Sequence, residues 1–223
     1  MLVLGMDTSS PAVSVAVVEL LPGPTWGRSA RWRVVDGGKH GELLATGIAS
    51  VLREVAARPA DLGAVAVGLG PGPFTGLRVG VMTAAATADA LGIPVYGVCS
   101  LDAVTDWEEH DTPRLVVTDA RRKEVYWAEY AADDERVAGP SVLRPDALKA
   151  ALDETGWTGR VVGAGAQLHG FAGAGEPLHP DPEQVVLLAA RRALDGAPGE
   201  VLTPLYLRRP DATPPGQPKR ATP

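Results

Sequence analysis

Two aspartates stand where an apolar run enters a tight turn, and each could help to hold a metal-bound nucleotide. Asp7 follows the apolar residues 2–6, and Asp119 follows residues 114–118. In folds that bind nucleotides between two halves, such turns wrap phosphates and the aspartates hold Mg²⁺ through water. Close approach of a phosphate favours glycine in the turn, and neither turn contains one. The alternative is that each aspartate caps its own hairpin turn.

Other members of this candidate nucleotide site flank the aspartates or follow a later strand. Two glycines after the strand predicted at 160–162 would lie flat against an adenine or a ribose, or would form an ordinary tight strand-to-helix connection. The pattern thus predicts the outline of a nucleotide site without the glycines that phosphates favour. The flanking candidates are Thr8, Ser9, Arg121, Gly163 and Gly165.

A glycine-rich segment at residues 68–78, GLGPGPFTGLR, leads into a helix predicted at 75–91. Such a turn aims backbone N–H groups at whatever lies above it. It has no Lys-Ser/Thr pair for a Walker loop, and its third glycine is misplaced for a dinucleotide fingerprint. Arg78 lies in the first helical turn, where the helix dipole disfavours a cation. With Gly72 and Thr75 it forms a candidate anion site, a solvated arginine being the alternative.

The helix predicted at 75–91 carries a small residue at every fourth place. Two interior glycines weaken a helix by about 1 kcal/mol each relative to alanine, so we expect a packing reason for them. A row of residues with very small side chains lets another helix approach closely; we call this row the ridge. That neighbour could belong to this chain or to another subunit. The ridge consists of Gly76, Gly80, Ala84 and Ala88.

A second helix is predicted at 42–57, with apolar residues at helical spacing and His40 at its start. A metal site on this helix would need a second histidine four residues after the first, and that place is Leu44. We therefore expect no metal site, and His40 is interpreted as a helix-start residue or a partner contact. The candidate partner surface combines the two helices in His40, Leu44, Ile48, Val51, Gly76, Gly80, Thr83, Ala84 and Thr87.

The order of predicted elements repeats, because a strand, an aspartate, a tight turn and a second strand occur around both Asp7 and Asp119. This repeat predicts a duplicated α/β fold with a cleft between two units, residues 1–105 and a reduced unit at 106–210. The Pro-rich tail, 211–223, is expected to be disordered. The predicted strands are 2–6, 12–18, 31–35 after a loop at 22–27, 64–69, 95–99, 114–118, 125–130 and 160–162, with further helices at 145–154 and 182–194.

The composition favours a soluble, cytoplasmic protein. The 223 residues are 45% hydrophobic, and no segment approaches the ~20 apolar residues that a membrane helix needs. The single cysteine, Cys99, suits a reducing compartment and reads as a small buried hydrophobe. The net charge of −6 argues against a surface built mainly for nucleic acid, so a partner would supply most phosphate contacts.

Basic clusters occur at 121–123, 191–192, 208–209 and 219–220. Such runs are most often solvated surface. The last two, near the end of the chain, could instead touch RNA or an acidic partner.

Taken together, the motifs resemble those of the bacterial TsaB (YeaZ) family. The most specific is GPGPFTGLR, although Pro73 stands where that family usually has serine, and the hairpin at 20–30 and the tail are longer here. The matching segments are 4–9 (LGMDTS) with 13–17 (VSVAV), 40–44 (HGELL), 67–80, 119–121 (DAR) with 124–128 (EVYWA), and 204–208 (PLYLR).

The resemblance implies an actin/hexokinase-like (ASKHA) fold and a role in forming threonylcarbamoyladenosine next to the anticodon of tRNAs that read codons beginning with A. In that family the chemistry belongs to the paralogous TsaD, which carries a metal-binding His-x-x-x-His. TsaB-like chains pair with TsaD through their two N-terminal helices, form a homodimer through the same surface, and work with the ATPase TsaE. The resemblance implies tRNA contact through the complex and no cofactor of the chain's own, and leaves open a nucleotide at the partner interface.

Two hypotheses about function follow. The first is a non-catalytic subunit that binds and activates a TsaD-like enzyme, in which Gly80→Leu or Ala84→Arg would abolish partner binding without unfolding the chain. The alternative is a small-molecule kinase or ATPase of the same superfamily that uses Asp7 and Asp119 with Mg²⁺. A metallopeptidase has no support without a second histidine near His40.

Overall fold

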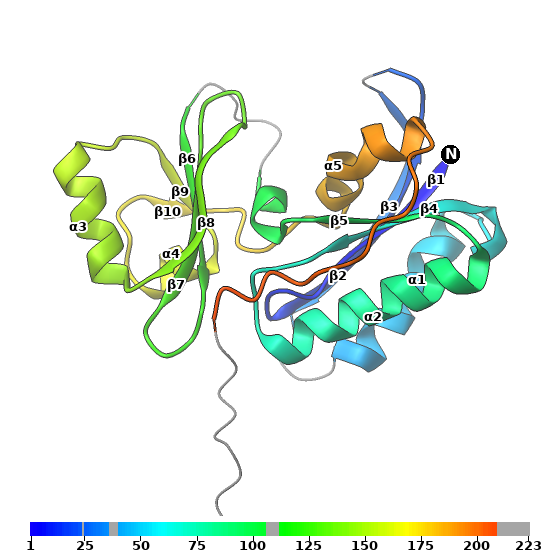
Figure 1. Cartoon of the computed structure of the whole chain (residues 1–223), viewed down its shortest axis with the longest axis horizontal. Helices are drawn as coiled ribbons and strands as arrows, with labels where there is room; N and C mark the ends of the chain where they lie inside the picture. Colours follow the sequence, from blue (N-terminus) through cyan, green and yellow to red (C-terminus); the bar gives the residue numbers. More distant parts are fainter. Residues whose placement is uncertain (24, 36–39, 106–111, 209–223) are drawn as a thin grey trace, which may run out of the picture.

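The computed structural model describes residues 1–23, 25–35, 40–105 and 112–208 as two five-stranded sheets with helices packed on them (Figure 1). This arrangement confirms the predicted α/β, actin/hexokinase-like class. The elements of the first half are β1 (Leu2–Asp7), β2 (Ala12–Leu20), β3 (Trp26–Val35), α1 (His40–Glu54), β4 (Leu62–Gly68), α2 (Phe74–Leu91) and β5 (Val95–Val98). The second half contains β6 (Arg114–Asp119), β7 (Val125–Tyr130), β8 (Arg136–Leu143), α3 (Pro145–Thr155), β9 (Arg160–Val162), α4 (Ala164–Leu168), β10 (Ala174–Gly175) and α5 (Pro182–Leu194).

The two sheets share one plan. The first has the order β3-β2-β1-β4-β5, and the second has the order β10-β9-β6-β7-β8. In each, the leading strand pairs antiparallel with the next strand of its hairpin and parallel with a later strand. The ends of β1 and β6 therefore lie at equivalent places, which confirms the repeat that the sequence indicated around Asp7 and Asp119.

Helices cover both faces of the first sheet. Side chains alternate along its strands, so neighbouring residues of one strand pack with helices on opposite faces. Leu4 and Met6 of β1 pack with α1 and α2, whereas Val3 packs with α5. Figure 1 shows α1 and α2 below this sheet and α5 above it. None of the helices within the described ranges is long and apolar enough to cross a membrane.

Several predicted boundaries were wrong. Strand β3 begins at Trp26, inside the predicted loop, because its pairing with β2 continues to Leu20. Helix α1 ends at Glu54 rather than at residue 57, since Ala56 has a positive φ of 52°. Strand β8 was missed because Gly139 and Pro140 interrupt its pattern; proline is tolerated there because β8 is an edge strand.

Helix α5, which was predicted at 182–194 within the second unit, packs on the first sheet. Val185, Val186 and Ala189 form one cluster with Val3 and Ala16. The chain therefore returns to its first half after the second sheet is complete. The predicted boundary at residue 105 stays a prediction, and the predicted tail, 211–223, lies outside the described residues.

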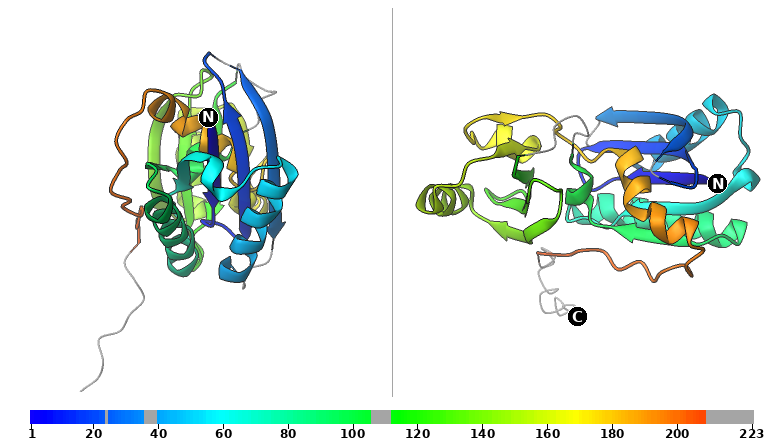
Figure 2. Two further views of the ribbon diagram at one scale, coloured as in Figure 1. Left: turned by 90° about the vertical axis from the view of Figure 1, so that its right-hand side faces the viewer. Right: turned by 90° about the horizontal axis from the view of Figure 1, so that it is seen from above.

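After α5 the chain runs back along the first half toward the second, as Figure 2 shows. The backbone N–H of Glu200 donates to Val95 O at 2.9 Å, and that of Leu205 donates to Leu69 O at 2.8 Å. Arg208 then reaches the β6–β7 turn, where its guanidinium lies 3.0 Å from the carboxylate of Glu124. This segment thus ties the two halves together.

The small-residue ridge of α2 is buried within this chain, so of the two neighbours that the sequence left open, this chain itself is the one that the structure places against it. A Cβ at Gly76 would lie 2.5 Å from Thr8 O, and one at Gly80 would overlap Thr8 Oγ1. Ala84 and Ala88 belong to the core. On α1, Leu44 and Val51 are likewise 1% and 0% exposed, because helically spaced apolar residues face their own sheet.

We expect Gly80→Leu to destabilise the fold rather than to act only on a partner. Overpacking a buried site of this kind costs about 1–3 kcal/mol of the free energy of unfolding. The matched control is Ala86→Leu, at an exposed position of the same helix, which should stay within about 0.5 kcal/mol of the parent. Urea unfolding followed by circular dichroism measures both, and equal stabilities of the two variants would contradict this packing.

Candidate functional site

A cleft of about 700 Å³ lies between the two halves. The first half contributes the residues after β1 and the start of α2, the second half contributes the β6–β7 turn and α4, and the returning chain adds two side chains. The lining residues are Ser9, Ser10, Pro11, His40, Gly72, Pro73, Phe74, Thr75, Gly76, Thr118, Asp119, Ala120, Arg121, Tyr126, Ala164, Leu168, Leu178, His179, Tyr206 and Arg208.

Asp7 does not line this cleft, contrary to the expectation that both aspartates could help to hold a metal-bound nucleotide between the two units. Its side chain is fully buried. One carboxylate oxygen accepts from Ser9 N at 2.8 Å and Ser9 Oγ at 2.7 Å, and the other lies 2.5 Å from Ser100 Oγ. Ser100 Oγ also accepts from Gly70 N at 2.9 Å. Both oxygens of Asp7 are therefore occupied by protein groups.

Burial dominates the electrostatics of Asp7. Loss of water raises the pKa of its carboxyl above the ordinary value, although the hydrogen bonds from Ser100 and Ser9 and the charge of Arg33 act in the opposite direction. A metal ligand needs a carboxylate that is ionised and open to the ion. Asp7 is closed to the cleft and is disfavoured in its charged form, so its position fits a structural role in the hairpin turn.

Helix α2 closes the first turn from the other side. Thr8 Oγ1 donates to Gly76 O at 2.8 Å. A Cβ at Gly72 would overlap the carbonyl of Ser9, so the glycine-rich turn lies directly against the β1–β2 turn. Gly72 and Thr75 line the cleft together with Ser9 and Ser10, but the carbonyls of Thr8 and Ser9 face Gly76 and Gly72, and Ser9 N is already bonded to Asp7.

The second turn is more open. Asp119 lies on the cleft wall, where its Oδ1 accepts from Arg121 N at 3.0 Å and lies 3.5 Å from His169 Nε2. Arg121 also lines the cleft. The two predicted aspartates thus occupy equivalent strand ends but different environments, and only Asp119 is within reach of a ligand.

The glycines after β9 serve packing, and neither lines the cleft. Gly163 has a φ of 102°, and a Cβ there would overlap Val117 O; one on Gly165 would lie 2.5 Å from the carbonyl carbon of Thr118. These contacts bring α4 close to β6. They support the tight strand-to-helix connection over the adenine-binding alternative.

Arg78 and His40 have partners within the chain. The Arg78 guanidinium lies 3.7 Å from the centre of the Phe74 ring, which in turn lies 4.9 Å from that of Tyr206. Arg78 is outside the cleft lining, so it is not grouped with Gly72 and Thr75 as an anion site. His40 Nε2 lies 3.2 Å from Ser10 O. Among the described residues, no group of three or more His, Cys, Asp or Glu side chains could hold a metal ion.

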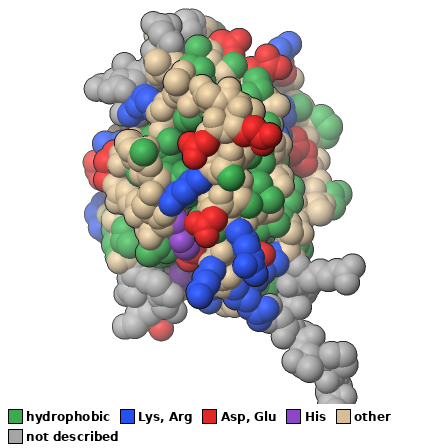
Figure 3. Space-filling view, turned by 90° about the vertical axis from the view of Figure 1, so that its left-hand side faces the viewer, with side chains coloured by type: hydrophobic (Ala, Val, Ile, Leu, Met, Phe, Trp, Pro, Cys, Tyr) green, Lys and Arg blue, Asp and Glu red, His purple; other side chains and the backbone are tan. Residues whose placement is uncertain are grey.

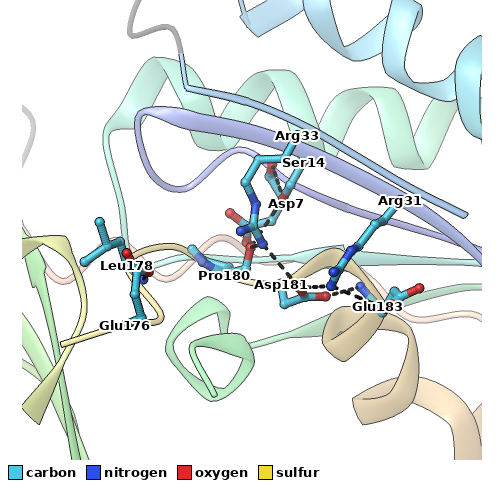
Figure 4. Close-up of polar contacts among 9 residues, drawn as sticks. All are labelled: Asp7, Ser14, Arg31, Arg33, Glu176, Leu178, Pro180, Asp181 and Glu183. Atoms are coloured by element: carbon cyan, nitrogen blue, oxygen red, sulfur yellow. Dashed lines mark hydrogen bonds and ion pairs between the residues drawn. The ribbon is translucent and has the colours of Figure 1, made fainter. Parts of the chain in front are cut away.

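A polar junction that sequence reasoning missed fixes the approach to α5 (Figure 4). Asp181 caps this helix by accepting from Glu183 N at 2.8 Å. Its other oxygen lies 3.3 Å from Arg33 and 3.4 Å from Arg31 of β3. Arg33 also donates to Pro180 O at 3.0 Å. The junction anchors the segment that crosses between the halves; the alternating arginines of β3 were its signal in the sequence.

The outer side of α1 and α2 forms a second candidate surface, which we call the helical face. It consists of the exposed residues Ala45, Thr46 and Ala49 of α1 with Met82 and Ala86 of α2. Met82 is 65% exposed. Charged residues border this face toward the helix ends, whereas its centre has small or apolar side chains, which suits close packing against another helix.

This fold and this site define an actin/hexokinase-like protein in which the aspartate after β1 is buried and the aspartate after β6 lines the cleft. The family model described as TsaD, tRNA N6-adenosine threonylcarbamoyltransferase, matches residues 37–157. An uncharacterized protein of Mycobacterium tuberculosis strain H37Rv is 47% identical, over 95% of this chain and 94% of that protein.

Relatives with assigned names come from other bacteria. The tRNA threonylcarbamoyladenosine biosynthesis protein TsaB of Escherichia coli strain K12 is 28% identical, over 93% of this chain and 95% of its own. The solved structure of YeaZ from Pseudomonas aeruginosa matches with a TM-score of 0.76 and 26% identity, over 92% of this chain and 99% of that one. The chain belongs to the TsaB (YeaZ) family.

The variant Asp7→Asn tests whether the Asp7 carboxylate is buried with a raised pKa, through the pH dependence of the free energy of unfolding. A raised native pKa means that the folded state binds the Asp7 proton more tightly than the unfolded state, so the free energy of unfolding falls as pH rises from the ordinary value of 3.8 through the native pKa. Asparagine removes this term. The free energy of unfolding of Asp7→Asn, relative to that of the parent, should therefore rise with pH and then level off.

Urea unfolding between pH 4 and pH 8 measures this difference. Ser100→Ala is the companion variant: it removes a hydrogen bond that lowers the pKa of Asp7, so the decline in stability should continue to a higher pH than in the parent. If the parent and Asp7→Asn declined in parallel over the whole range, the Asp7 carboxyl could not be buried as described.

Proposed function

We propose that this chain is a non-catalytic subunit in the formation of threonylcarbamoyladenosine in tRNA, and that it binds and activates a TsaD-like enzyme. Its family includes proteins named for this biosynthesis, over nearly the full length of this chain. As the family implies, the modified position would be next to the anticodon of tRNAs that read codons beginning with A. A TsaE-like ATPase would complete the complex, in the cytoplasm.

The main support for the proposal that catalysis belongs to the partner is the full burial of the Asp7 carboxylate. A kinase or ATPase of this superfamily would use Asp7 and Asp119 together with Mg²⁺. Here Asp7 is buried under Ser9 and Ser100 and cannot reach an ion in the cleft. Of the two aspartates, only Asp119 lines the cleft wall. A single carboxylate is a weak site for Mg²⁺ without a bound nucleotide to share the ion.

The helical face supports the partner-binding half of the proposal. Its exposed residues come from the two N-terminal helices that lie side by side on one sheet face. His40, Ile48, Thr83 and Thr87, which the sequence assigned to a partner surface, are partly exposed beside it. We place the TsaD-like partner on this face, and in its absence a second copy of this chain.

Met82→Arg should weaken binding of the TsaD-like protein by at least about tenfold, which corresponds to about 1.4 kcal/mol. The reason is that a buried, unpaired guanidinium at the centre of an interface is costly. The same variant should reduce self-association. Isothermal titration with the TsaD-like protein of the same organism measures the affinity, and analytical ultracentrifugation measures the self-association.

Leu188→Arg is the matched control, because Leu188 is 43% exposed on α5, on the opposite face of the first sheet. It should bind like the parent, and both variants should keep the thermal midpoint of the parent. Full affinity of Met82→Arg would remove the helical face from the interface. Turnover of MgATP by the isolated chain, abolished in Asp7→Asn, would favour the kinase alternative.

A further inference from the structure

The turn that joins β6 to β7 has a backbone that its residues do not favour. Glu124 N donates to Arg121 O at 3.0 Å, which closes a four-residue turn with Arg122 and Lys123 at its centre. Their φ angles are 50° and 61°, and Arg121 itself has a φ of 61°. Hairpin turns with two positive φ angles normally contain Asn-Gly or Asp-Gly, which adopt them at little cost. Such an outlier at an exposed tip points to a function for the side chains.

The surrounding contacts hold this turn in place and occupy its acidic neighbours. Arg208 donates to Ala120 O at 2.7 Å and lies 3.0 Å from Glu124. Asp119 accepts from Arg121 N and lies near His169. Within the part of the chain that the structure describes, the side chains of Arg121 and Lys123 have no carboxylate partner.

A further cation lies beside the turn. The pairing of Val125 with Leu143 places the exposed Arg144 opposite Glu124, at the start of α3. We call Arg121, Arg122, Lys123 and Arg144 the basic tip. Figure 3 shows Lys and Arg side chains gathered at the lower end of this side of the molecule. This concentration of positive charge runs against the chain's net charge of −6.

We propose that the basic tip binds the phosphate backbone of the tRNA, which assigns this chain a direct RNA contact in the complex. The proposal rests on the proposed function, which supplies the RNA. The cations are spread over a hairpin tip and a helix start, and the tip itself, residues 121–124 (RRKE), has no apolar side chain to anchor a peptide. Several exposed cations at one tip suit a phosphate backbone, and contacts to phosphates position a nucleic acid without reading its sequence. From the sequence alone, the run 121–123 was interpreted as solvated surface, with Arg121 also assigned to the candidate nucleotide site.

The double variant R122N/K123G removes the two central positive charges and should keep the turn, because Asn-Gly is the pair that this backbone conformation favours. The probe is an unmodified tRNA transcript, titrated with the full chain, alone and together with the TsaD-like protein, at 50–200 mM salt. Each cation that no longer neutralises a phosphate lowers the slope of log K against log salt concentration by about one. We therefore expect a slope smaller by about two and weaker binding at low salt.

The charge-conserving variant R122K/K123R is the matched control and should bind tRNA like the parent. An unchanged slope and affinity for R122N/K123G would overturn the proposal. Normal tRNA binding with reduced affinity for the TsaD-like protein would also overturn it, and would assign the tip to an acidic protein surface. Failure of the parent chain to bind the TsaD-like protein would instead count against the proposed function, while the titration of the chain alone would still decide the role of the tip.

Discussion

The close packing of helix α2 on the β1–β2 turn determines what both candidate surfaces can do. Gly76 and Gly80 let the helix backbone come within contact of Thr8, and Thr8 Oγ1 donates back to Gly76 O. The turn that would wrap phosphates thereby has its Thr8 side packed against the chain's own helix. The same packing turns the small-residue side of α2 inward and leaves Met82 and Ala86 on the outside.

The sealed aspartate follows from the same arrangement. With the turn closed above it, Asp7 satisfies its oxygens from Ser9 and Ser100 rather than from an ion or water. A buried carboxyl of this kind is tolerated because hydrogen bonds offset part of the cost of losing water. The second turn has no such cover, and Asp119, Arg121 and Arg208 remain on the cleft wall. The duplicated halves have therefore diverged, and the open half is the one beside the basic tip.

Sequence reasoning predicted the repeat and most of the elements, though not β8, α4 or β10. It did not predict the direction in which the helices face. The apolar spacing of Leu44 and Val51, and the ridge through Gly80, predicted a contact surface correctly, yet that contact is with the chain's own sheet. Periodicity reports a buried face without saying what buries it. The closure of Asp7 depends on Ser100, 93 residues away in the chain, and long-range pairings of this kind leave no local pattern. The positive φ angles at Arg122 and Lys123 were likewise invisible, because nothing in those residue types predicts them.

One reconstituted assay tests the central claim most directly, namely that this chain acts through its outer helices and not through its aspartate. The parent, Asp7→Asn and Met82→Arg chains would each be combined with the TsaD-like protein, the TsaE-like ATPase, a threonylcarbamoyl donor and unmodified tRNA, and the initial rate of threonylcarbamoyladenosine formation measured. The account predicts a rate near that of the parent for Asp7→Asn and little product with Met82→Arg. Loss of product with Asp7→Asn, together with a normal rate for Met82→Arg, would contradict it.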